Sequence, residues 1–564
     1  MTAVRRLITT LMLLLTATAL LAQETPVRRT TEQVTAETDR DLNDARALRL
    51  SLNEAIATAM KQNLGVQLQN YETRIAGYNL QGEHGIFDFI SAADGTLSAS
   101  RNSTTSATET SSGRSINLNG SINQIIPTGG QYSFGFRNAK TVAAGGFRNV
   151  NPSYESSLDF NFAQPLMRDF GVDVTKRNIN IARNNLGITQ GAFRTVVMDT
   201  ASAVEQAYLD LTYARRNIEV VKEALFLARD QARITQIRID VGASAPLDIL
   251  QPNVQIATTE ESLVTATASV RDAEDRLRAL LNLPESEWDR PIVPTDEIAY
   301  SALPVDVNQA VETALRNRPE MDQQRLTTDT RRITALYTRN QVLPQLDVNL
   351  GYGVSGVAGR TLDVDASGNP VVVSSTNYNK ALSQVFGNDF PSWSVGFTFG
   401  LPLMNIRARA NAKAAELDLD QSRSSELQTR QNIAVEVRST ARDIQTFART
   451  IAASRAAREA AERNVEAERK RYENGMTTNF QVLEVQKQLS DARVRELFSL
   501  VGYNKAVAAY HRAVGDILEI HNIRVEEPET APEPDWKTTF FDRYNWLNYG
   551  SRTGNRVKTE EQPK

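Results

Sequence analysis

The chain has 564 residues, a net charge of −4 and 23% charged residues. That length suffices for several domains, and the mild acidity gives no electrostatic reason to expect nucleic acid as a partner. The sequence has no cysteine and three scattered histidines, which excludes disulfides, thiolate metal sites and two-histidine helical metal motifs. Because it also lacks a nucleophile–base–acid spacing and a phosphate-binding loop, we expect no enzyme and no cofactor.

Residues 1–22 have the pattern of a secretory signal peptide. Arg5 and Arg6 precede an apolar run from Leu7 to Leu21, and Ala22 is a suitable last residue before cleavage. The run is short for a membrane anchor, and no later segment approaches the ~20 apolar residues of a membrane-spanning helix. Residues 23–47 follow as an N-terminal extension. We therefore expect the mature chain to work in the periplasm, in the outer membrane or outside the cell.

The next region, residues 48–283, begins with a short helix and continues with strands. Ser51 and Glu54 form a capping box at the start of the helix. Segments 116–122, 131–137 and 157–163 then alternate apolar or aromatic residues with Asn, Ser, Asp and Arg, which predicts strands with one wet face. In a secreted chain this fits a barrel with lipid outside and water inside, and a soluble half-buried sheet is the alternative. Segments 95–101 and 125–131 leave the strand count of this half between two and four, and residues 102–113 are expected to form a long exposed loop.

A long helical hairpin completes this half. Pro165 in FAQPLM stands between the last strand and a helical run over residues 172–240, about 100 Å if fully helical. Apolar residues recur every seven positions from Val204 to Ile239, the spacing of coiled-coil packing. RIDVGASAPLDIL (238–250) then reverses the chain, with glycine as a left-handed cap, and a return helix is expected over roughly 246–282.

The same series appears again in residues 304–523, after a linker over 284–303. Asp306 and Gln309 replace the first capping pair, segments 345–352 and 393–399 are strand-like, and residues 355–390 are expected to form a long loop. Pro402 in FGLPLM precedes a helical run over 405–473, and RYENGMTTNFQVL (471–483) leads to a return helix over roughly 480–515. Gly475 lies 475 − 242 = 233 residues after Gly242. The duplication predicts two hairpins per chain, and the tail over 524–564 is expected to be largely irregular.

The strand count predicts an oligomer. Four to six strands cannot close a membrane barrel, because the smallest barrels have about eight. An open sheet edge is not tolerated in hydrocarbon, because its backbone groups have no partners there. Several chains must therefore share one barrel.

The doubled order of short helix, strands, proline, long helix, glycine tip and return helix resembles the TolC family of outer-membrane efflux proteins, over about residues 48–523. The most specific elements are the doubled R-x-x-x-G-x-[ST] tip and the doubled Q/L-P-L junction. The resemblance implies a mixed α/β membrane protein. Its internally duplicated long α-helical hairpins would form a periplasmic tunnel, joined to an antiparallel transmembrane β-barrel that a homotrimer shares. Four strands per chain would give twelve in all. The extra segment around 125–131 either lengthens the extracellular strands or enlarges the barrel toward eighteen.

The implied function is that of the outer-membrane channel of a tripartite efflux or type I secretion system, gated at its periplasmic helical tips. Its partners would be a periplasmic adaptor, an inner-membrane pump of the RND, ABC or a similar class, and outer-membrane lipid, with no nucleic acid. The sequence does not name the cargo. The alternatives are a periplasmic adaptor, which predicts one hairpin per chain, and a structural coiled-coil protein without channel activity, which does not explain strands with an apolar outer face.

The resemblance also implies functional residues at the tips. The expected adaptor contacts are Arg238, Val241, Gly242, Ala243, Ser244, Arg471, Asn474, Gly475, Met476 and Thr477. The expected gate residues are Asp248, Tyr472, Gln481 and Glu484. Thr477 stands where family members often carry an arginine that bonds the gate aspartate, and Gln481 stands where they carry a second acid. The alternative for Asp248 and Glu484 is that they are ordinary solvated tip residues.

Overall fold

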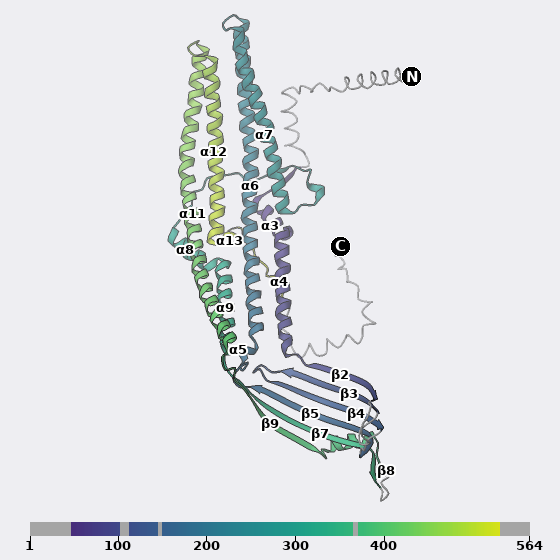
Figure 1. The fold of residues 1–564 in the computed structure, drawn as a ribbon. Helices are drawn as coiled ribbons and strands as arrows, with labels where there is room; N and C mark the ends of the chain where they lie inside the picture. Colours follow the sequence, from purple (N-terminus) through teal and green to yellow (C-terminus); the bar gives the residue numbers. More distant parts are fainter. Residues whose placement is uncertain (1–46, 102–111, 145–148, 365–369, 531–564) are drawn as a thin grey trace, which may run out of the picture. The chain divides into compact units, whose positions relative to one another are not determined.

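The computed structural model describes residues 47–101, 112–144, 149–364 and 370–530 (Figure 1). The predicted signal peptide, all of the extension except its last residue, and residues 531–564 of the tail lie outside these ranges. The chain divides into two compact units. The hairpin unit has described residues 47–67, 196–318 and 433–525, and the sheet unit has the remaining described residues within 68–195, 319–432 and 526–530.

The hairpin unit contains the two predicted helical hairpins. Helix α6 (Arg177–Asp240) has 64 residues and α11 (Ile406–Glu473) has 68, and both helices contribute residues to each unit. The return helices are α7 (Leu250–Leu281), preceded by the 3₁₀ turn η2 (Pro246–Ile249), and α12 (Asn479–Val514). Shorter helices are α3 (Leu52–Gln62), α8 (Val307–Asn317) and α13 (Ile517–Ile520). The run predicted from residue 172 is interrupted at Lys176, so that α5 (Val172–Thr175) stands apart from α6.

The predicted seven-residue seam forms the core of the first hairpin. Val204, Leu211, Ile218 and Leu225 on α6 are at most 2% exposed, and they belong to one cluster with buried side chains of α7 that include Leu263. Complete burial of such a side chain contributes about 1.5–3 kcal/mol. The heptad spacing therefore fixes which faces of the two helices meet.

Arg458 interrupts the corresponding seam of α11 at the position that matches Leu225. The long aliphatic stem of an arginine can cover apolar surface at such a position. The structure shows a second role for this residue, because its guanidinium donates to Glu462 at 2.8 Å and to Glu496 of α12 at 2.5 Å. At Arg458, the apolar contacts of the seam are therefore replaced by polar contacts between α11 and α12.

The expected linker contains an unpredicted pairing. Strand β6 (Ile292–Pro294) pairs in parallel with β1 (Leu48–Leu50), and the 3₁₀ turn η3 (Glu285–Glu287) precedes it. The carboxylate of Glu274 on α7 accepts from the backbone N–H of Ile292 at 3.0 Å and from Arg278 at 3.1 Å. Since Glu274 and Arg278 are 5% and 4% exposed, a buried ion pair holds this segment against the hairpin.

Both predicted helix caps are present. The Ser51 hydroxyl accepts from the Glu54 N–H, and the Glu54 carboxylate accepts from the Ser51 N–H at 3.0 Å, which completes the capping box. Asp306 accepts from the backbone N–H groups of Asn308 and Gln309. The repeated cap thus starts α3 and α8 with different side chains.

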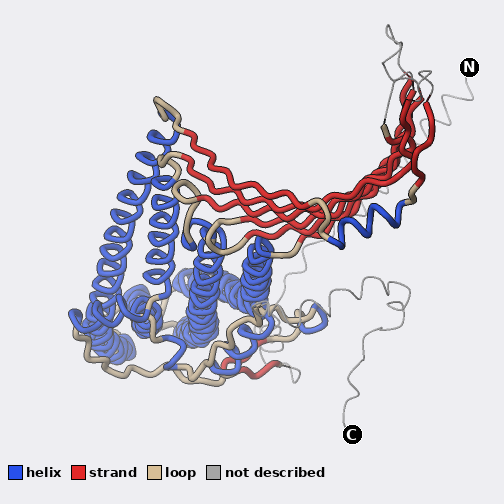
Figure 2. Tube along the Cα trace, turned by 90° about the horizontal axis from the view of Figure 1, so that it is seen from below, coloured by secondary structure: helices blue, strands red, loops and turns tan. Residues whose placement is uncertain are grey.

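The sheet unit contains a seven-stranded antiparallel sheet in the order β2-β3-β4-β5-β7, with β8 and β9 both pairing with β7 (Figure 2). The strands are β2 (Ile90–Arg101), β3 (Ser112–Ile125), β4 (Gln131–Ala144), β5 (Val150–Pro165), β7 (Gln345–Val364), β8 (Pro370–Ser375) and β9 (Pro391–Gly400). The accompanying helices are α4 (Leu64–Glu83), the 3₁₀ turn η1 (His84–Phe87), α9 (Pro319–Asn340) and α10 (Tyr378–Gly387). Segments 95–101 and 125–131 do belong to strands or their hairpin turn, so the first half supplies four strands.

The prediction of a long loop over residues 355–390 is wrong. Strand β7 continues to Val364, and β8 and α10 occupy most of the remainder. Helix α10 packs on β7 through Ala381 and Val385, which are buried. A Cβ on Gly356 of β7 would lie 2.2 Å from the carbonyl oxygen of Ala381, so glycine at this position permits the close approach. The sequence signal for β7 was diluted here because glycine and serine alternate with its small apolar residues.

No helix within the described ranges is long and apolar enough to cross a membrane.

Candidate functional site: the hairpin tips and the two-faced sheet

The two hairpin tips share one backbone geometry. Gly242 has φ +74° and Gly475 has φ +73°, the left-handed conformation that glycine adopts without steric cost. In the first tip, Ala243 N–H donates to the Arg238 carbonyl at 2.7 Å, and Gly242 N–H donates to the Ile239 carbonyl at 2.9 Å. This pair of bonds is the Schellman motif, which satisfies the last carbonyls of a helix.

The second tip repeats the motif. Met476 N–H donates to the Arg471 carbonyl at 2.9 Å, and Gly475 N–H donates to the Tyr472 carbonyl at 3.0 Å. In both tips the arginine lies four residues before the glycine, so its carbonyl accepts the bond of the motif that comes from the residue after the glycine. The repeated R-x-x-x-G spacing therefore ends each of the two long helices with the same motif.

The arginine side chain of the first tip joins the two hairpins. The guanidinium carbon of Arg238 lies 4.4 Å from the ring centroid of Tyr472, and an Nη of Arg238 donates to the Glu473 carbonyl at 3.3 Å. Tyr472 is 5% exposed. A cation over an aromatic face contributes about 0.5–1 kcal/mol at exposed sites and more when it is desolvated, so this contact is a modest latch.

The arginine of the second tip has a different partner. Arg471 donates to the carboxylate of Glu468 at 3.1 Å, and the Thr477 hydroxyl donates to the other oxygen of that carboxylate at 2.5 Å. Glu468 is 6% exposed. Thr477, which replaces the arginine expected from the resemblance, thus closes the second tip on itself. Glu468 escaped the sequence analysis, where a lone glutamate on a charged helix gives no signal.

The expected gate residues lie near the tips but have local partners within one chain. The Asp248 carboxylate accepts from the Ala245 N–H at 3.1 Å and caps the return helix, and Glu484 accepts from Gln488 at 3.2 Å. The Gln481 N–H donates to the Thr478 hydroxyl at 3.4 Å. Among the described residues of one chain, no hydrogen bond joins Asp248 to Tyr472.

Asn479 forms a second link between the hairpins. Its side-chain oxygen accepts from Gln231 of α6 at 2.7 Å, and its side-chain N–H₂ donates to the Asp248 carbonyl at 3.4 Å. Gln231 is 2% exposed. Near the tips the two hairpins are therefore connected by single hydrogen bonds, by the latch and by an ion pair between Arg469 and Asp230 at 3.6 Å, each worth about 1 kcal/mol or less.

The tips also expose large apolar side chains. Val241 is 71% exposed, Leu247 75%, Met476 76% and Phe480 55%. Val241 and Met476 were among the expected adaptor contacts, whereas Leu247 and Phe480 were missed because they follow the motif. Exposed apolar side chains clustered with polar neighbours are typical of a surface that contacts another protein.

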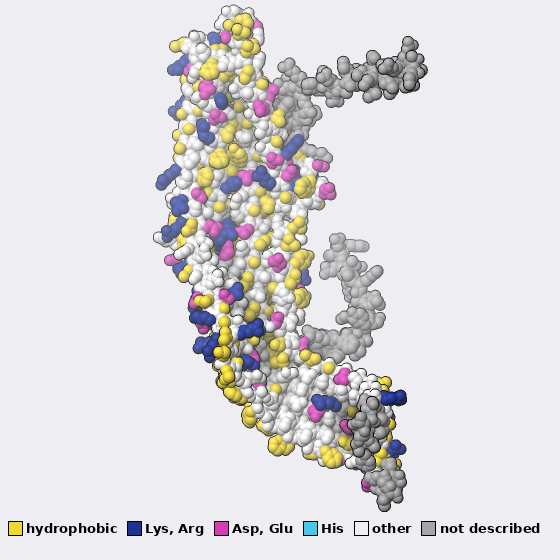
Figure 3. All heavy atoms as spheres, viewed as in Figure 1, with side chains coloured by type: hydrophobic (Ala, Val, Ile, Leu, Met, Phe, Trp, Pro, Cys, Tyr) yellow, Lys and Arg dark blue, Asp and Glu magenta, His cyan; other side chains and the backbone are white. Residues whose placement is uncertain are grey.

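The sheet has one apolar face and one polar face. Residues that pair directly across strands share a face, and one such row is Phe134, Phe160, Tyr352 and Trp393. The apolar face further includes Leu97, Ile116, Leu118, Ile122, Phe136, Leu158, Phe162, Val348, Leu350, Val395, Phe397 and Phe399. Hydrophobic side chains line the margin of the sheet where β9 runs, as Figure 3 shows. Trp393 and Phe397 are 78% and 71% exposed, so one chain leaves this part of the apolar face uncovered, whereas α10 covers the part around Gly356 of β7.

The opposite face is mainly polar. Side-chain hydrogen bonds cross it between Asn119 and Asp94 at 2.9 Å and between Asn349 and Thr398 at 3.0 Å. Arg137 and Asp159 form an ion pair at 3.7 Å. The period-two pattern therefore separates apolar from polar side chains over most of the sheet, with Arg114 of β3 and Lys140 of β4 as charged exceptions on the apolar face.

The two predicted junction prolines terminate strands. Pro165 is the last residue of β5 and pairs with Asp347 of β7, and Pro402 lies between β9 and α11. Proline lacks the N–H that a strand interior requires, so it is tolerated at these ends. Immediately after Pro165, Leu166 N–H donates to the Leu346 carbonyl at 2.7 Å.

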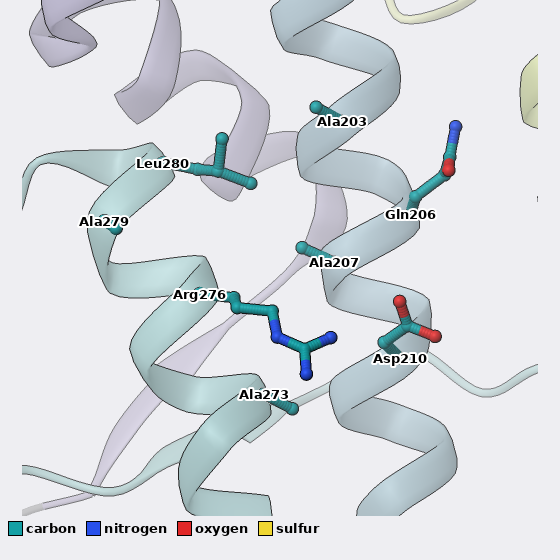
Figure 4. A pocket seen from close by; sticks show the side chains of 8 residues that line it. All are labelled: Ala203, Gln206, Ala207, Asp210, Ala273, Arg276, Ala279 and Leu280. Carbon is teal, nitrogen blue, oxygen red and sulfur yellow. The ribbon is translucent and has the colours of Figure 1, made fainter.

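One groove of the hairpin unit is lined in part by short alanine side chains. It measures about 510 Å³ and lies between α6 and α7, where the side chains of Ala203, Ala207, Ala273 and Ala279 are too short to fill it (Figure 4). Across the described residues, no three acidic or histidine side chains are grouped so that they could hold a metal ion.

The family model described as Outer membrane efflux protein matches residues 92–283 and 310–515. The chain belongs to this family. It is 24% identical over 423 residues to the outer membrane protein TolC of Escherichia coli, covering 69% of this chain and 76% of TolC. It is 22% identical over 207 residues to the cobalt-zinc-cadmium resistance protein CzcC of Cupriavidus metallidurans, covering 37% of this chain and about half, 49%, of CzcC.

The fold is that of solved outer-membrane channels. The Campylobacter jejuni CmeC outer membrane channel superposes with a TM-score of 0.59 at 15% identity, covering 89% of this chain and 90% of CmeC. Duplicated hairpins, a two-faced sheet and the family match together define an outer-membrane efflux channel.

Proposed function

We propose that three copies of this chain form a continuous export duct. Their sheets would close one β-barrel in the outer membrane, and their hairpins would form a helical tunnel in the periplasm. The amphipathic sheet carries this proposal, because its apolar face and its two unpaired edges are stable in a membrane only if other chains complete the barrel. The homotrimer follows the family resemblance.

The tips are the proposed gate and docking surface. Six tips would surround the periplasmic mouth, and the apolar side chains of Val241, Leu247, Met476 and Phe480 would contact a periplasmic adaptor of an inner-membrane pump. Because the hairpins of one chain are joined here by a few single hydrogen bonds, the tips can separate at a cost of a few kcal/mol. Three copies of Asp248 and Glu484 would place like charges around the mouth and favour cations.

The test is extraction, sizing and conductance. The mature protein should require detergent for extraction from outer membranes, should scatter light as a trimer, and should give a small cation-selective conductance in a planar bilayer. Asp248→Ala and Glu484→Ala should raise this conductance. Asp322→Ala is the matched control, because Asp322 forms an exposed ion pair with Arg325 within α9. A water-soluble species without conductance would refute the channel and favour the adaptor or coiled-coil alternatives.

A further inference from the structure

We infer that the barrel of this protein has eighteen strands, six from each of three chains, formed by pairing β9 of one copy with β2 of the next. The inference rests on the proposed trimer. It concerns the two edges of the sheet, and the partner of each edge is a second copy of this chain. It sets the width of the pore at the outer membrane.

The hairpin β2–β3 is a full member of the sheet. Twelve consecutive residue pairs join β2 to β3, from Ile90↔Asn123 to Arg101↔Ser112. Fourteen consecutive pairs then join β3 to β4, from Ser112↔Ala144 to Ile125↔Gln131. The ladder has no register shift in either pairing, so these two strands continue the sheet and do not form an appendage.

The two faces of the sheet also continue onto this hairpin. Leu97 pairs with Ile116, on the face that carries Phe134 and Phe160, and both are exposed in one chain. On the other face, Ser98 bonds Ser115 at 2.7 Å and Asn117 donates to Thr96 at 3.1 Å. Between residues 91 and 99, the residues of β2 that lie on the same face as Leu97 are all uncharged. The hairpin is therefore suited to lipid on one side and water on the other, as β5 and β7 are.

The edges of the six-strand ladder are complementary. Every neighbouring pair from β2 to β9 is antiparallel, so with six strands the two edge strands run in opposite directions. Strand β9 of one copy therefore meets β2 of the next as an antiparallel pair, the arrangement of outer-membrane barrels. Hydrocarbon leaves no partner for the backbone groups of these edges except another strand. The short strand β8 lies on the same side of β7 as β9, but it pairs only with residues 360–364 of β7. It therefore does not change the relative direction of the edge strands β2 and β9.

The strand number determines the width. With strands about 4.8 Å apart and tilted by about 40°, a closed barrel of eighteen strands has a backbone diameter of about 36 Å, compared with about 24 Å for twelve. Barrels of 16–18 strands leave an aqueous channel inside. The barrel therefore does not restrict cargo size, and selection by size is confined to the helical tips.

Cysteine cross-linking tests the edge assignment, and the natural chain has no cysteine that could interfere. One series combines Ser98→Cys on β2 with a single cysteine at successive polar-face positions of β9, namely 392, 394, 396 and 398. The matched series replaces Ser98→Cys by Gly135→Cys on β4, a position where an added Cβ meets no atom within 4 Å. In a barrel of eighteen strands, at least one pair of the first series should form a reducible covalent trimer and no pair of the second should. In a barrel of twelve strands built from β4, β5, β7 and β9, the second series should cross-link instead.

The unmodified protein provides an independent readout. Electron microscopy of the detergent-extracted trimer along its threefold axis should resolve eighteen strands in a barrel with a backbone diameter of about 36 Å. A trimer with twelve strands, or one in which neither cysteine series cross-links, would overturn this inference and leave the proposed export duct standing. A species that is not a membrane-extracted oligomer would instead refute the proposed function.

Discussion

Replacing Gly475 by alanine isolates the energetic role of the tip glycines. Gly475 has φ +73°, and a Cβ added there would meet no atom within 4 Å, so the substitution introduces backbone strain without a clash. An L-residue other than glycine pays about 1–2 kcal/mol in this conformation. The ratio of open to closed tip should therefore rise about 5- to 30-fold.

Hydrogen exchange of the full-length protein in detergent measures this ratio. The Met476 amide is the reporter, because it donates to the Arg471 carbonyl at 2.9 Å in the closed tip. Gly475→Ala should speed its exchange by the predicted factor. Gly475→Asn is the matched control, since asparagine tolerates the left-handed region, and it should speed exchange much less.

The first tip provides a replicate of the same argument. Gly242 has φ +74°, with open space around its Cβ position, so Gly242→Ala should speed exchange of the Ala243 amide by a similar factor. If alanine leaves exchange unchanged at both tips, or if asparagine is as disruptive as alanine, the motif is not maintained by the left-handed glycine and our explanation of the repeated spacing is wrong.

Three further predictions concern the hairpin unit. Gly502→Ala would place a Cβ 2.4 Å from the Phe447 ring, and overpacking of about 1–3 kcal/mol should lower the melting temperature of the protein. Glu274→Gln should remove the buried charged partner of Arg278, which keeps its ion pair with the exposed Asp275. It should speed proteolysis in residues 284–303, because removal of one partner of a buried ion pair costs up to about 3 kcal/mol. Burial raises the pKa of Glu462, but hydrogen bonds and charge from two arginines outweigh it and leave the pKa below 4.5. Glu462 therefore stabilises the fold above about pH 4.5, this contribution is lost as pH falls through its lowered pKa, and Glu462→Gln should reduce the melting-temperature difference between pH 6 and pH 3.

Sequence periodicity predicted the long elements because packing repeats along them. The seven-residue spacing from Val204 to Leu225 predicted the buried face of α6. The alternation of apolar and polar residues predicted the face of the sheet that carries Phe134 and Phe160. In each case many residues report the same environment, so a single exception such as Arg458 does not change the assignment.

Short elements that depend on distant partners could not be predicted in the same way. Strand β6 has three residues and pairs with β1, about 240 positions earlier in the chain, and α10 depends on its contact with Gly356 of β7. Neither segment carries enough residues for a periodic signal. Their stability comes from tertiary contacts, which override local preference.

The tip motif predicts the backbone geometry but not the side-chain contacts. The R-x-x-x-G spacing specifies backbone bonds, and both copies form them. It does not specify the arginine side chain, since Arg238 reaches Tyr472 of the other hairpin whereas Arg471 binds Glu468 of its own. The partner depends on residues outside the motif, and the two repeats differ in those residues. In a trimer the six tips would consequently be of two kinds, joined by the Arg238 latch within each chain. Opening would then follow threefold symmetry, with the two hairpins of each chain moving together unless the latch and the Asn479 hydrogen bonds are broken.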